Sequence, residues 1–394
     1  MSEYWLFAAG LALAACAYGL GRARALASAG GDIRALHSLP GHYGWAAVQM
    51  TLAPALAVLL LARLAGWAGP AVMVAALVAA LAGLGWSLCR GTARFRARNA
   101  VERGVMGFLI IASTIAIATT AGIVLSMLFE TRNFFALYDW RDFFFSATWA
   151  PQFQGQSQLG ILPLLWGTLY ISAIALAFAV PVGLLAAIYM SEYAGRRLRA
   201  LVKPALEILA GIPTIVYGLF ALITVGPMLR DYFAQPLGLG SSASSVMTAG
   251  LVMGIMLIPF VSSLSDDIIS QVPRALHDGA LALGATRSET IRQVILPAAL
   301  PGIVGAVLLA ASRAIGETMI VVLGAGAAAR LSLNPFEAMT TITVKIVSQL
   351  TGDSDFAAPE TLVAFALGLT LFVITLGLNV LALVIVRRYR EQYE

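Results

Sequence analysis

Two ionisable residues lie inside a stretch that is otherwise apolar, and one of them, an arginine, has the chemistry to bind an anion. Arg313 and Glu317 occur within residues 297–324. An arginine keeps its charge in an apolar setting, and its planar fork matches tetrahedral oxyanions. On a continuous helix, a spacing of four residues puts both side chains on one face, where they can pair. Ser312 and Thr318 would add hydroxyl donors.

Two interpretations of Arg313 and Glu317 stay open from the residues alone. Each charged side chain costs about 2.5–3.5 kcal/mol at the centre of a bilayer on insertion scales, so it needs a function or a partner there. The two side chains either form an ion pair that fixes helix packing, or belong to a polar site on a transport pathway. An arginine by itself does not choose between phosphate, sulfate, molybdate and tungstate.

The segment of residues 266–297, called the coupling loop below, has the pattern of an amphipathic helix. An apolar stripe within residues 280–285 stands beside charged side chains, and Gly284 interrupts the helical pattern. Pro273 and Pro297 bracket the segment, and each can begin a helix. The pattern alone allows a helix that lies on the membrane surface or one that fills a groove on a partner.

The elements that position these residues are expected to be membrane-spanning helices. The chain is 60% hydrophobic and 11% charged, whereas soluble domains carry about 25% charged residues. A helix that crosses the bilayer needs about 20 mostly apolar residues. The sequence therefore predicts an all-α integral membrane protein with nine spans, at residues 4–20, 45–64, 70–89, 104–129, 162–190, 205–229, 246–264, 297–324 and 361–386.

The basic residues predict how these spans are oriented. Eighteen of the 25 Lys and Arg residues fall in alternate loops, which we assign to the cytoplasm. The coupling loop and the C-terminus are then cytoplasmic, and the N-terminus is outside. A basic run at residues 90–103 separates an N-terminal region with three spans, residues 1–104, from a region with six, residues 105–394. The break Gly211-Ile212-Pro213 predicts a bent sixth span.

Several residues of the coupling loop keep the spacing of a family motif. The loop resembles the EAA loop of ABC importer permeases, with Asp278 for the usual Glu, Gly279 for Ala and Val294 for Ile. The residues that stand at the positions of the motif, these three replacements included, are Asp278, Gly279, Ala280, Gly284, Val294, Ile295, Leu296 and Pro297. The resemblance implies a six-helix core of the type I, MetI-like kind. It also implies that the loop forms short coupling helices that sit in a cleft of a separate ATPase.

Four further segments resemble permeases of ABC-type phosphate importers, of the PstC rather than the PstA type. They are residues 144–153, 162–194, 207–222 and 312–326. The resemblance covers residues 105–394 and leaves the first 104 residues unassigned. It implies a permease that moves inorganic phosphate together with a cytoplasmic ABC ATPase dimer, a second, PstA-like permease and an external phosphate-binding protein. The alternatives are a permease for another oxyanion and a secondary transporter driven by an ion gradient.

Other classes of function lack the residues they need. The sequence contains no Gly-Lys-Ser or Gly-Lys-Thr, so a phosphate-binding P-loop is absent, and we expect no enzyme activity in this chain. Its three histidines and two cysteines have no metal-ligand spacing, so we expect neither metal nor cofactor. The net charge of +5 is spread between apolar runs, which indicates membrane lipid rather than nucleic acid as the surroundings. We therefore expect a multi-pass protein of a prokaryotic cytoplasmic (inner) membrane.

Overall fold

The computed structural model of this 394-residue chain describes residues 3–67, 69–152, 157–352 and 358–390. The chain forms two compact units, Met1–Gly122 and Ile123–Glu394. The division between them lies within one long helix, α4 (Ala97–Leu137), which also contains the expected boundary at residue 104. The assignment of residues 1–104 and 105–394 to separate domains therefore stays a prediction.

The first unit is built from three helices and the start of α4. They are α1 (Glu3–Ser28), α2 (Pro40–Leu64) and α3 (Pro70–Arg90), with a short 3₁₀ turn, η1 (Ile33–Ala35), between α1 and α2. The helices pack at glycines: a Cβ on Gly21 would lie 2.6 Å from that of Ala47, and one on Gly83 would meet the carbonyl oxygen of Met50. Small residues thus let these apolar helices approach closely, as is common in membranes.

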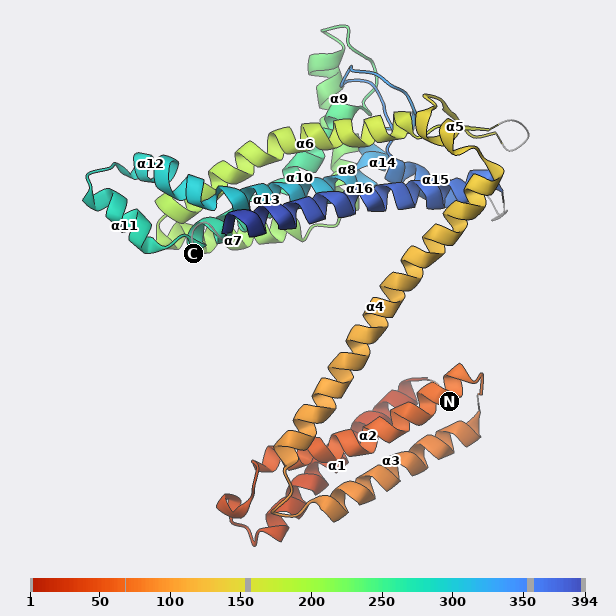
Figure 1. The fold of residues 1–394 in the computed structure, drawn as a ribbon, viewed down its shortest axis with the longest axis vertical. Coiled ribbons are helices and arrows are strands. Elements are labelled where there is room, and N and C mark those ends of the chain that lie inside the picture. The colour runs from red at the N-terminus through yellow and green to blue at the C-terminus, as the bar shows by residue number, and fades with distance from the viewer. Residues whose placement is uncertain (1–2, 68, 153–156, 353–357, 391–394) are drawn as a thin grey trace. The chain divides into compact units, whose positions relative to one another are not determined.

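The second unit contains the remaining elements (Figure 1). They are α5 (Trp140–Phe145), β1 (Trp149–Ala150), β2 (Gln158–Leu159), α6 (Leu162–Ile188), η2 (Tyr189–Tyr193), α7 (Arg196–Ala210), α8 (Thr214–Phe220), η3 (Ala221–Val225), α9 (Gly226–Leu229), η4 (Arg230–Ala234), α10 (Val246–Gln271), α11 (Arg274–Ala282), α12 (Arg287–Thr290), η5 (Ile291–Ile295), α13 (Leu296–Ile315), α14 (Met319–Gly324), α15 (Ile342–Gly352) and α16 (Pro359–Arg390). The strands form one antiparallel pair, and η2 to η5 are π-turns.

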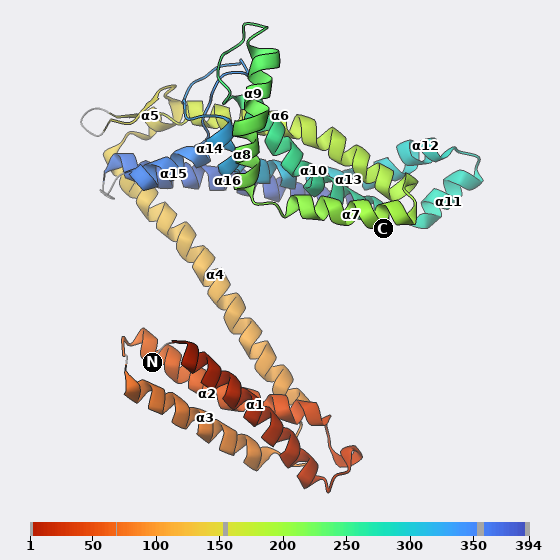
Figure 2. The ribbon, with the colours of Figure 1, turned by 180° about the vertical axis from the view of Figure 1, so that it is seen from behind.

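Long helices form a bundle in the second unit. Figure 1 and Figure 2 show α6, α10, α13 and α16 packed side by side, with α11 and α12 at one end and α5 and α15 at the other. The core between α6 and α10 includes Ala175, Ala179, Met253 and Leu257, all fully buried. Small residues on these two helices bring their backbones together. Little space is left for α6 to move without α10.

The all-α membrane class is confirmed. Within the described residues, eight helical segments are long and apolar enough to cross a membrane: Pro40–Leu64, Pro70–Arg90, Ala97–Leu137, Leu162–Tyr193, Thr214–Ala234, Val246–Gln271, Arg287–Ile315 and Pro359–Arg388. The expected first span, residues 4–20, lies within α1. Each expected span thus corresponds to a helical segment, although the sixth begins later than expected and the eighth is interrupted.

The sixth span starts later than expected. Residues 205–210 belong to α7, a separate amphipathic helix, and the apolar segment begins at Thr214 after the predicted break at Gly211–Pro213. The physical reason is that Pro213 restricts the residue before it and caps a new helix. The charged first turns of α7 also suit an aqueous boundary better than the centre of a bilayer.

The eighth span is interrupted within its last third. The expected helix over residues 297–324 ends at Ile315, and α14 begins only at Met319. A glycine at position 316 ends α13, since its backbone N–H bonds to the carbonyl of Ser312 while the following residues leave the helical path. This break decides the geometry of Arg313 and Glu317.

Candidate functional site

The coupling loop forms two short helices at one end of the bundle, as its pattern predicts. Helix α11 begins directly after Pro273. It ends in a Schellman turn, in which Ala285 N bonds to Ala280 O at 3.2 Å and Gly284 N bonds to Leu281 O at 3.0 Å. Gly284 has a φ of 89°, which side chains on L-residues rarely allow. The glycine expected from the motif is therefore required by the backbone.

The second half of the loop restarts the helix with its own cap. Thr286 is the N-cap of α12 and forms a reciprocal capping box with Glu289. The helix then continues through η5 into α13, with Pro297 in the first turn of α13. Val294 and Leu296 are half-buried there, and Leu296 packs against the apolar cluster around Ile295.

The tip of the loop is exposed and partly apolar. Leu283 is 91% exposed, and the side chain of Asp278 is 77% exposed. A Cβ added to Gly279 would have no neighbour within 4 Å, while Ala280 is half-buried. An exposed leucine beside a carboxylate at the end of a rigid loop is a surface that a partner groove can bind.

Arg313 and Glu317 do not form the ion pair that their spacing allows. Arg313 lies in the last turn of α13, is exposed, and places its guanidinium carbon 5.9 Å from the centre of the Phe260 ring. Glu317 lies in the break after α13, and no ion pair joins the two in the part of the chain that the structure describes. The expected shared helix face was wrong, because the helix ends between them.

Glu317 caps the next helix instead. Its Oε1 accepts hydrogen bonds from Met319 N at 3.1 Å and Ile320 N at 3.4 Å, at the start of α14. Thr343 Oγ1 donates to the carbonyl oxygen of Glu317 at 2.9 Å. A carboxylate at a helix start satisfies free N–H groups and is favoured by the helix dipole. Glu317 thus shapes the break, and no carboxylate among the described residues pairs with Arg313.

Ser312 and Thr318, the other expected pathway residues, flank the same break and are half-buried. Thr318 Oγ1 lies 3.5 Å from the carbonyl oxygen of Gly316, at the limit of a hydrogen bond. The structure therefore brings Ser312, Arg313, Glu317 and Thr318 into one interrupted segment with both charged and hydroxyl groups. Such breaks in membrane helices occur where the backbone is covered by protein or lines a polar path.

A second charged cluster, between α7 and α10, was missed by the sequence reasoning. Asp266 is only 1% exposed, and both of its oxygens accept hydrogen bonds from Arg199 Nη2 at 3.0 Å. Lys203 Nζ donates to Asp266 at 3.0 Å and to Asp267 at 3.1 Å. Arg199 and Lys203 are one turn apart on an amphipathic helix, which is the signal that would have indicated a shared carboxylate partner.

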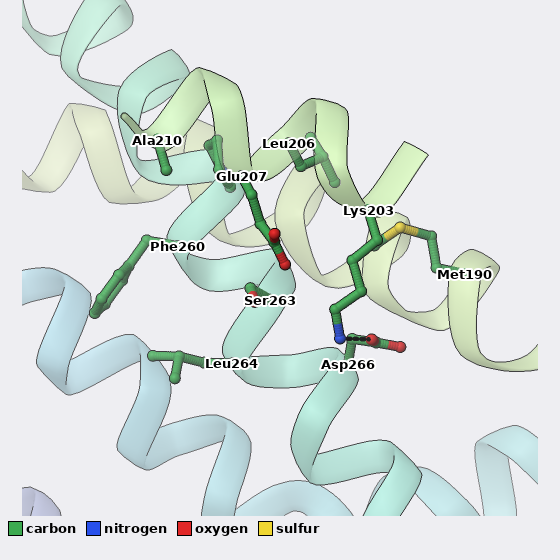
Figure 3. A pocket seen from close by; sticks show the side chains of 10 residues that line it. Met190, Lys203, Leu206, Glu207, Ala210, Phe260, Ser263, Leu264 and Asp266 are labelled. Atoms are coloured by element: carbon green, nitrogen blue, oxygen red, sulfur yellow. Dashed lines mark hydrogen bonds and ion pairs between the residues drawn. The ribbon is translucent and has the colours of Figure 1, made fainter. Parts of the chain in front are cut away.

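This cluster closes one side of a cavity of about 240 Å³ between α7 and α10 (Figure 3). Lys203 and Asp266 meet in a hydrogen bond at its wall, and Glu207 points into it from α7. The hydrogen bonds to Asp266 and then Asp267 raise the pKa of Lys203 above its usual value. Lys203 therefore stays charged at neutral pH, and α7 is tied to α10. Phe260, which contacts Arg313, also lines this cavity.

Comparison with known proteins identifies the family of this chain. The model described as "Binding-protein-dependent transport system inner membrane component" matches residues 179–391, more than half of the chain. The chain belongs to this permease family. A second model, described as "Phosphate ATP-binding cassette transporter", matches residues 8–80. It covers the N-terminal region that the sequence resemblance left unassigned.

Curated relatives of this permease are PstC proteins. The chain is 40% identical over 247 residues to the phosphate transport system permease protein PstC 1 of Mycobacterium tuberculosis, which covers 58% of this chain and 72% of the relative. It is 35% identical over 252 residues to the PstC of Mesorhizobium japonicum, covering 59% and 74%. The expected resemblance to PstC-like permeases is confirmed.

Solved structures agree on the fold of the permease. The alginate ABC transporter in complex with an alginate-bound periplasmic protein matches with a TM-score of 0.50 and 18% identity, over 75% of this chain and 98% of that chain. At this identity the similarity concerns the fold alone. It supports the expected importer-type fold of the core, while the family match and the apolar helices show a multi-pass membrane permease. The part of the chain that the structure describes holds no cluster of three or more metal-binding side chains.

Proposed function

We propose that this permease moves inorganic phosphate inward across the cytoplasmic membrane as one subunit of an ATP-driven importer. ATP hydrolysis takes place in a separate cytoplasmic ABC ATPase dimer, which binds the coupling loop. A second, PstA-like permease completes the membrane pathway, and an external phosphate-binding protein delivers the substrate. Ser312, Arg313, Glu317 and Thr318 belong to the pathway. Asp278, Gly279, Ala280, Gly284, Val294, Leu296 and Pro297 form the contact with the ATPase or its anchor.

The observation that carries this proposal is the geometry of the coupling loop. Its ends are capped by its own residues, its tip exposes Leu283 and Asp278, and its base is anchored beside α6 and α10. A surface of this kind fits a groove on a partner, and this chain has no P-loop of its own. The loop therefore gives a separate ATPase a place to act on the transmembrane helices.

Phosphate as the cargo is supported by two independent facts. The curated relatives of this chain are named phosphate transport permeases. In addition, Arg313 is an exposed guanidinium without a carboxylate partner in the described residues, in a segment where Glu317 is occupied as a helix cap. A free guanidinium among hydroxyl groups suits an oxyanion.

The orientation follows from the charges. The basic loops place the coupling loop in the cytoplasm, and the end of α16 lies at the same end of the bundle as α11 (Figures 1 and 2). The C-terminus is then cytoplasmic and the N-terminus external. The three N-terminal spans form an accessory membrane region before the six-span permease core.

Uptake of radiolabelled phosphate by vesicles that contain the complete complex tests the cargo. Unlabelled sulfate and molybdate are added as competitors at increasing concentration. We expect unlabelled phosphate to compete fully and both other oxyanions to leave uptake nearly unchanged. Equal competition by sulfate or molybdate would reassign the permease to another oxyanion.

A further inference from the structure

Helix α6 makes side-chain contacts with the coupling loop at its cytoplasmic end. The helix continues into the π-turn η2, where Glu192 Oε2 lies 3.7 Å from His277 Nε2 of α11. The guanidinium carbon of Arg287, in α12, lies 5.6 Å from the centre of the Tyr193 ring. Adjacent residues of one turn thus contact both short helices of the loop.

These contacts are the polar connection between the loop helices and the bundle. Among the residues that the structure describes, no other ion pair, side-chain hydrogen bond or cation–π contact joins α11 or α12 to a helix outside residues 266–297. The side chains of Glu192 and His277 are only 15% and 25% exposed, so solvent screens their interaction less than that of a surface pair. Single π-turns within helices are often found at functional sites.

The external end of α6 contacts the segment that follows α14. Trp166 Nε1 donates to Ser332 O at 2.8 Å, and Tyr170 OH donates to Leu333 O at 2.7 Å. Between them, Thr168 Oγ1 accepts a hydrogen bond from Ile342 N at 3.0 Å and is buried. The external end of α6 therefore contacts this segment on two sides, with Trp166 and Tyr170 on one face and Thr168 on the opposite face.

The external segment in turn holds the break beside the pathway residues. The hydroxyl groups of Thr341 and Thr343 lie 2.9 Å apart, and Thr343 donates to the carbonyl oxygen of Glu317. Contacts thus run from the coupling loop to η2, along α6, and through residues 341–343 to the break at Glu317. The fully buried alanines Ala175, Ala179 and Ala187 pack the helix closely against its neighbours on both sides of Pro181.

We propose that α6 carries the movement of the coupling loop to the pathway break, with Glu192 and His277 as the positioning pair at its cytoplasmic end. This inference rests on the proposed function. The pair lines a hollow of about 540 Å³. Its other lining residues include Ser191, Arg199, Ser270, Arg274, Asp278 and Arg287. When the ATPase shifts α11, the pair pulls or pushes η2, and the rigid helix transmits the shift to Thr168 and Ile342.

A charge exchange in the whole reconstituted complex tests the cytoplasmic contact. Phosphate taken up per ATP hydrolysed is measured for E192K, H277E and the double variant E192K/H277E. H277E places a carboxylate beside Glu192 and Asp278. E192K places a lysine near the arginines that line the same hollow. Each single change therefore brings like charges together. We expect each to lower the ratio by about fivefold or more, at the low end of allosteric coupling changes, and the double variant to recover most of it.

The matched control is E102K, which removes the exposed Arg98–Glu102 pair on α4, and we expect it to leave the ratio unchanged. The proposal is overturned if both single variants keep the wild-type ratio or if the exchange fails to improve on them. If the charged variants do not assemble with the ATPase, the variants Y193L and Y193F test the contact between η2 and the loop instead. Phenylalanine keeps the ring under Arg287 and should retain the ratio, while leucine should lower it.

The far end of the helix provides a second test. T168V removes the acceptor for Ile342 N, whereas T168S keeps it. We expect T168V to lower uptake per ATP without weakening binding of the ATPase, and T168S to behave as wild type. Unchanged uptake per ATP in T168V would contradict transmission through α6. A wild-type complex that does not take up phosphate would instead refute the proposed function.

Discussion

The coupling loop and the break at residues 315–319 both interrupt helices of the bundle, but they are stabilised in different ways. In the loop, the Schellman turn at Gly284 and the capping box of Thr286 and Glu289 satisfy the helix ends locally. At the break, Glu317 caps α14, but its carbonyl oxygen depends on Thr343, 26 residues away in the chain.

This difference indicates different roles for the two regions. A loop whose helix ends are capped by local bonds keeps its shape when it is pushed, so it can serve as a preformed docking element. A break that is held by a distant segment changes when that segment moves. In the proposed importer, the loop receives the movement of the ATPase and the break responds to it. The predictions below separate these two roles.

The largest effect is expected from G284D in the loop. Aspartate at a φ of 89° is strained, and it adds a charge to the docking surface, so both uptake and ATPase association should be lost while the protein stays in the membrane. Uptake and co-purification of the ATPase measure this. The control is G238D, at another left-handed glycine with open space around it, which should keep both. Normal association in G284D would refute the coupling role.

The next effect is expected from R313Q at the break. Loss of a charged donor to an oxyanion should reduce uptake at limiting phosphate by roughly tenfold or more, because hydrogen bonds to charged groups contribute about 1.5–3 kcal/mol. ATPase association should remain normal, which distinguishes this variant from G284D. The matched control is R330Q, an exposed arginine 3.9 Å from Glu337. Unaltered uptake at limiting phosphate in R313Q would leave Arg313 with a packing role.

A smaller effect is expected from D266N, which affects the contact of α7 with α10. Arg199 and Lys203 would lose a buried partner, and the melting temperature of the purified chain should fall. Breaking a fully buried pair costs about 3–5 kcal/mol, but the two cations are 36% and 32% exposed, so we expect roughly 1–3 kcal/mol. D267N, whose carboxylate is 56% exposed, is the control and should cost less. An equal loss in both variants would contradict the central position of Asp266.

The pH dependence of this contact has a definite sign. The pKa of Lys203 is raised in the folded state, so its contribution is fully present below the unfolded value near 10.5 and is lost only as the pH rises through the higher folded pKa. Lys203 therefore stays charged from about pH 6 to about pH 9. Over this range it should not reduce the difference in stability between wild type and D266N.

The smallest effect is expected from G279A, also in the loop. Alanine matches the family motif, and a Cβ at this position meets nothing within 4 Å. Glycine in a helix interior is about 1 kcal/mol less favourable than alanine, so α11 should gain stability and uptake should stay at the wild-type level. A marked loss of uptake would mean that the ATPase contacts the backbone at Gly279 directly.

The sequence was most informative where the signals are local. Pro273 and Gly284 predicted the two ends of α11, because caps and left-handed glycines act within a few residues. The membrane class followed from composition and from the length of the apolar runs. The break at Gly211–Pro213 was also visible, although hydropathy alone placed the start of the sixth span too early.

The sequence was least informative where distant residues decide. Hydropathy does not distinguish a continuous helix from one that ends at Ile315 and restarts at Met319, since both halves are apolar. The cap made by Glu317 and the bond from Thr343 are contacts between segments far apart in the chain. The spacing of Arg199 and Lys203 indicates a shared carboxylate partner, but the choice of Asp266 on another helix has no fixed spacing in the sequence.

The most direct test of the account is the energy source of uptake in sealed vesicles that contain the whole complex. Phosphate accumulation is measured with ATP enclosed in the compartment that holds the ATPase, and separately with an imposed proton or sodium gradient and no ATP. The account predicts accumulation only with ATP, and none with either gradient alone. Accumulation driven by a gradient without ATP, at the same rate in wild type and G284D, would contradict it.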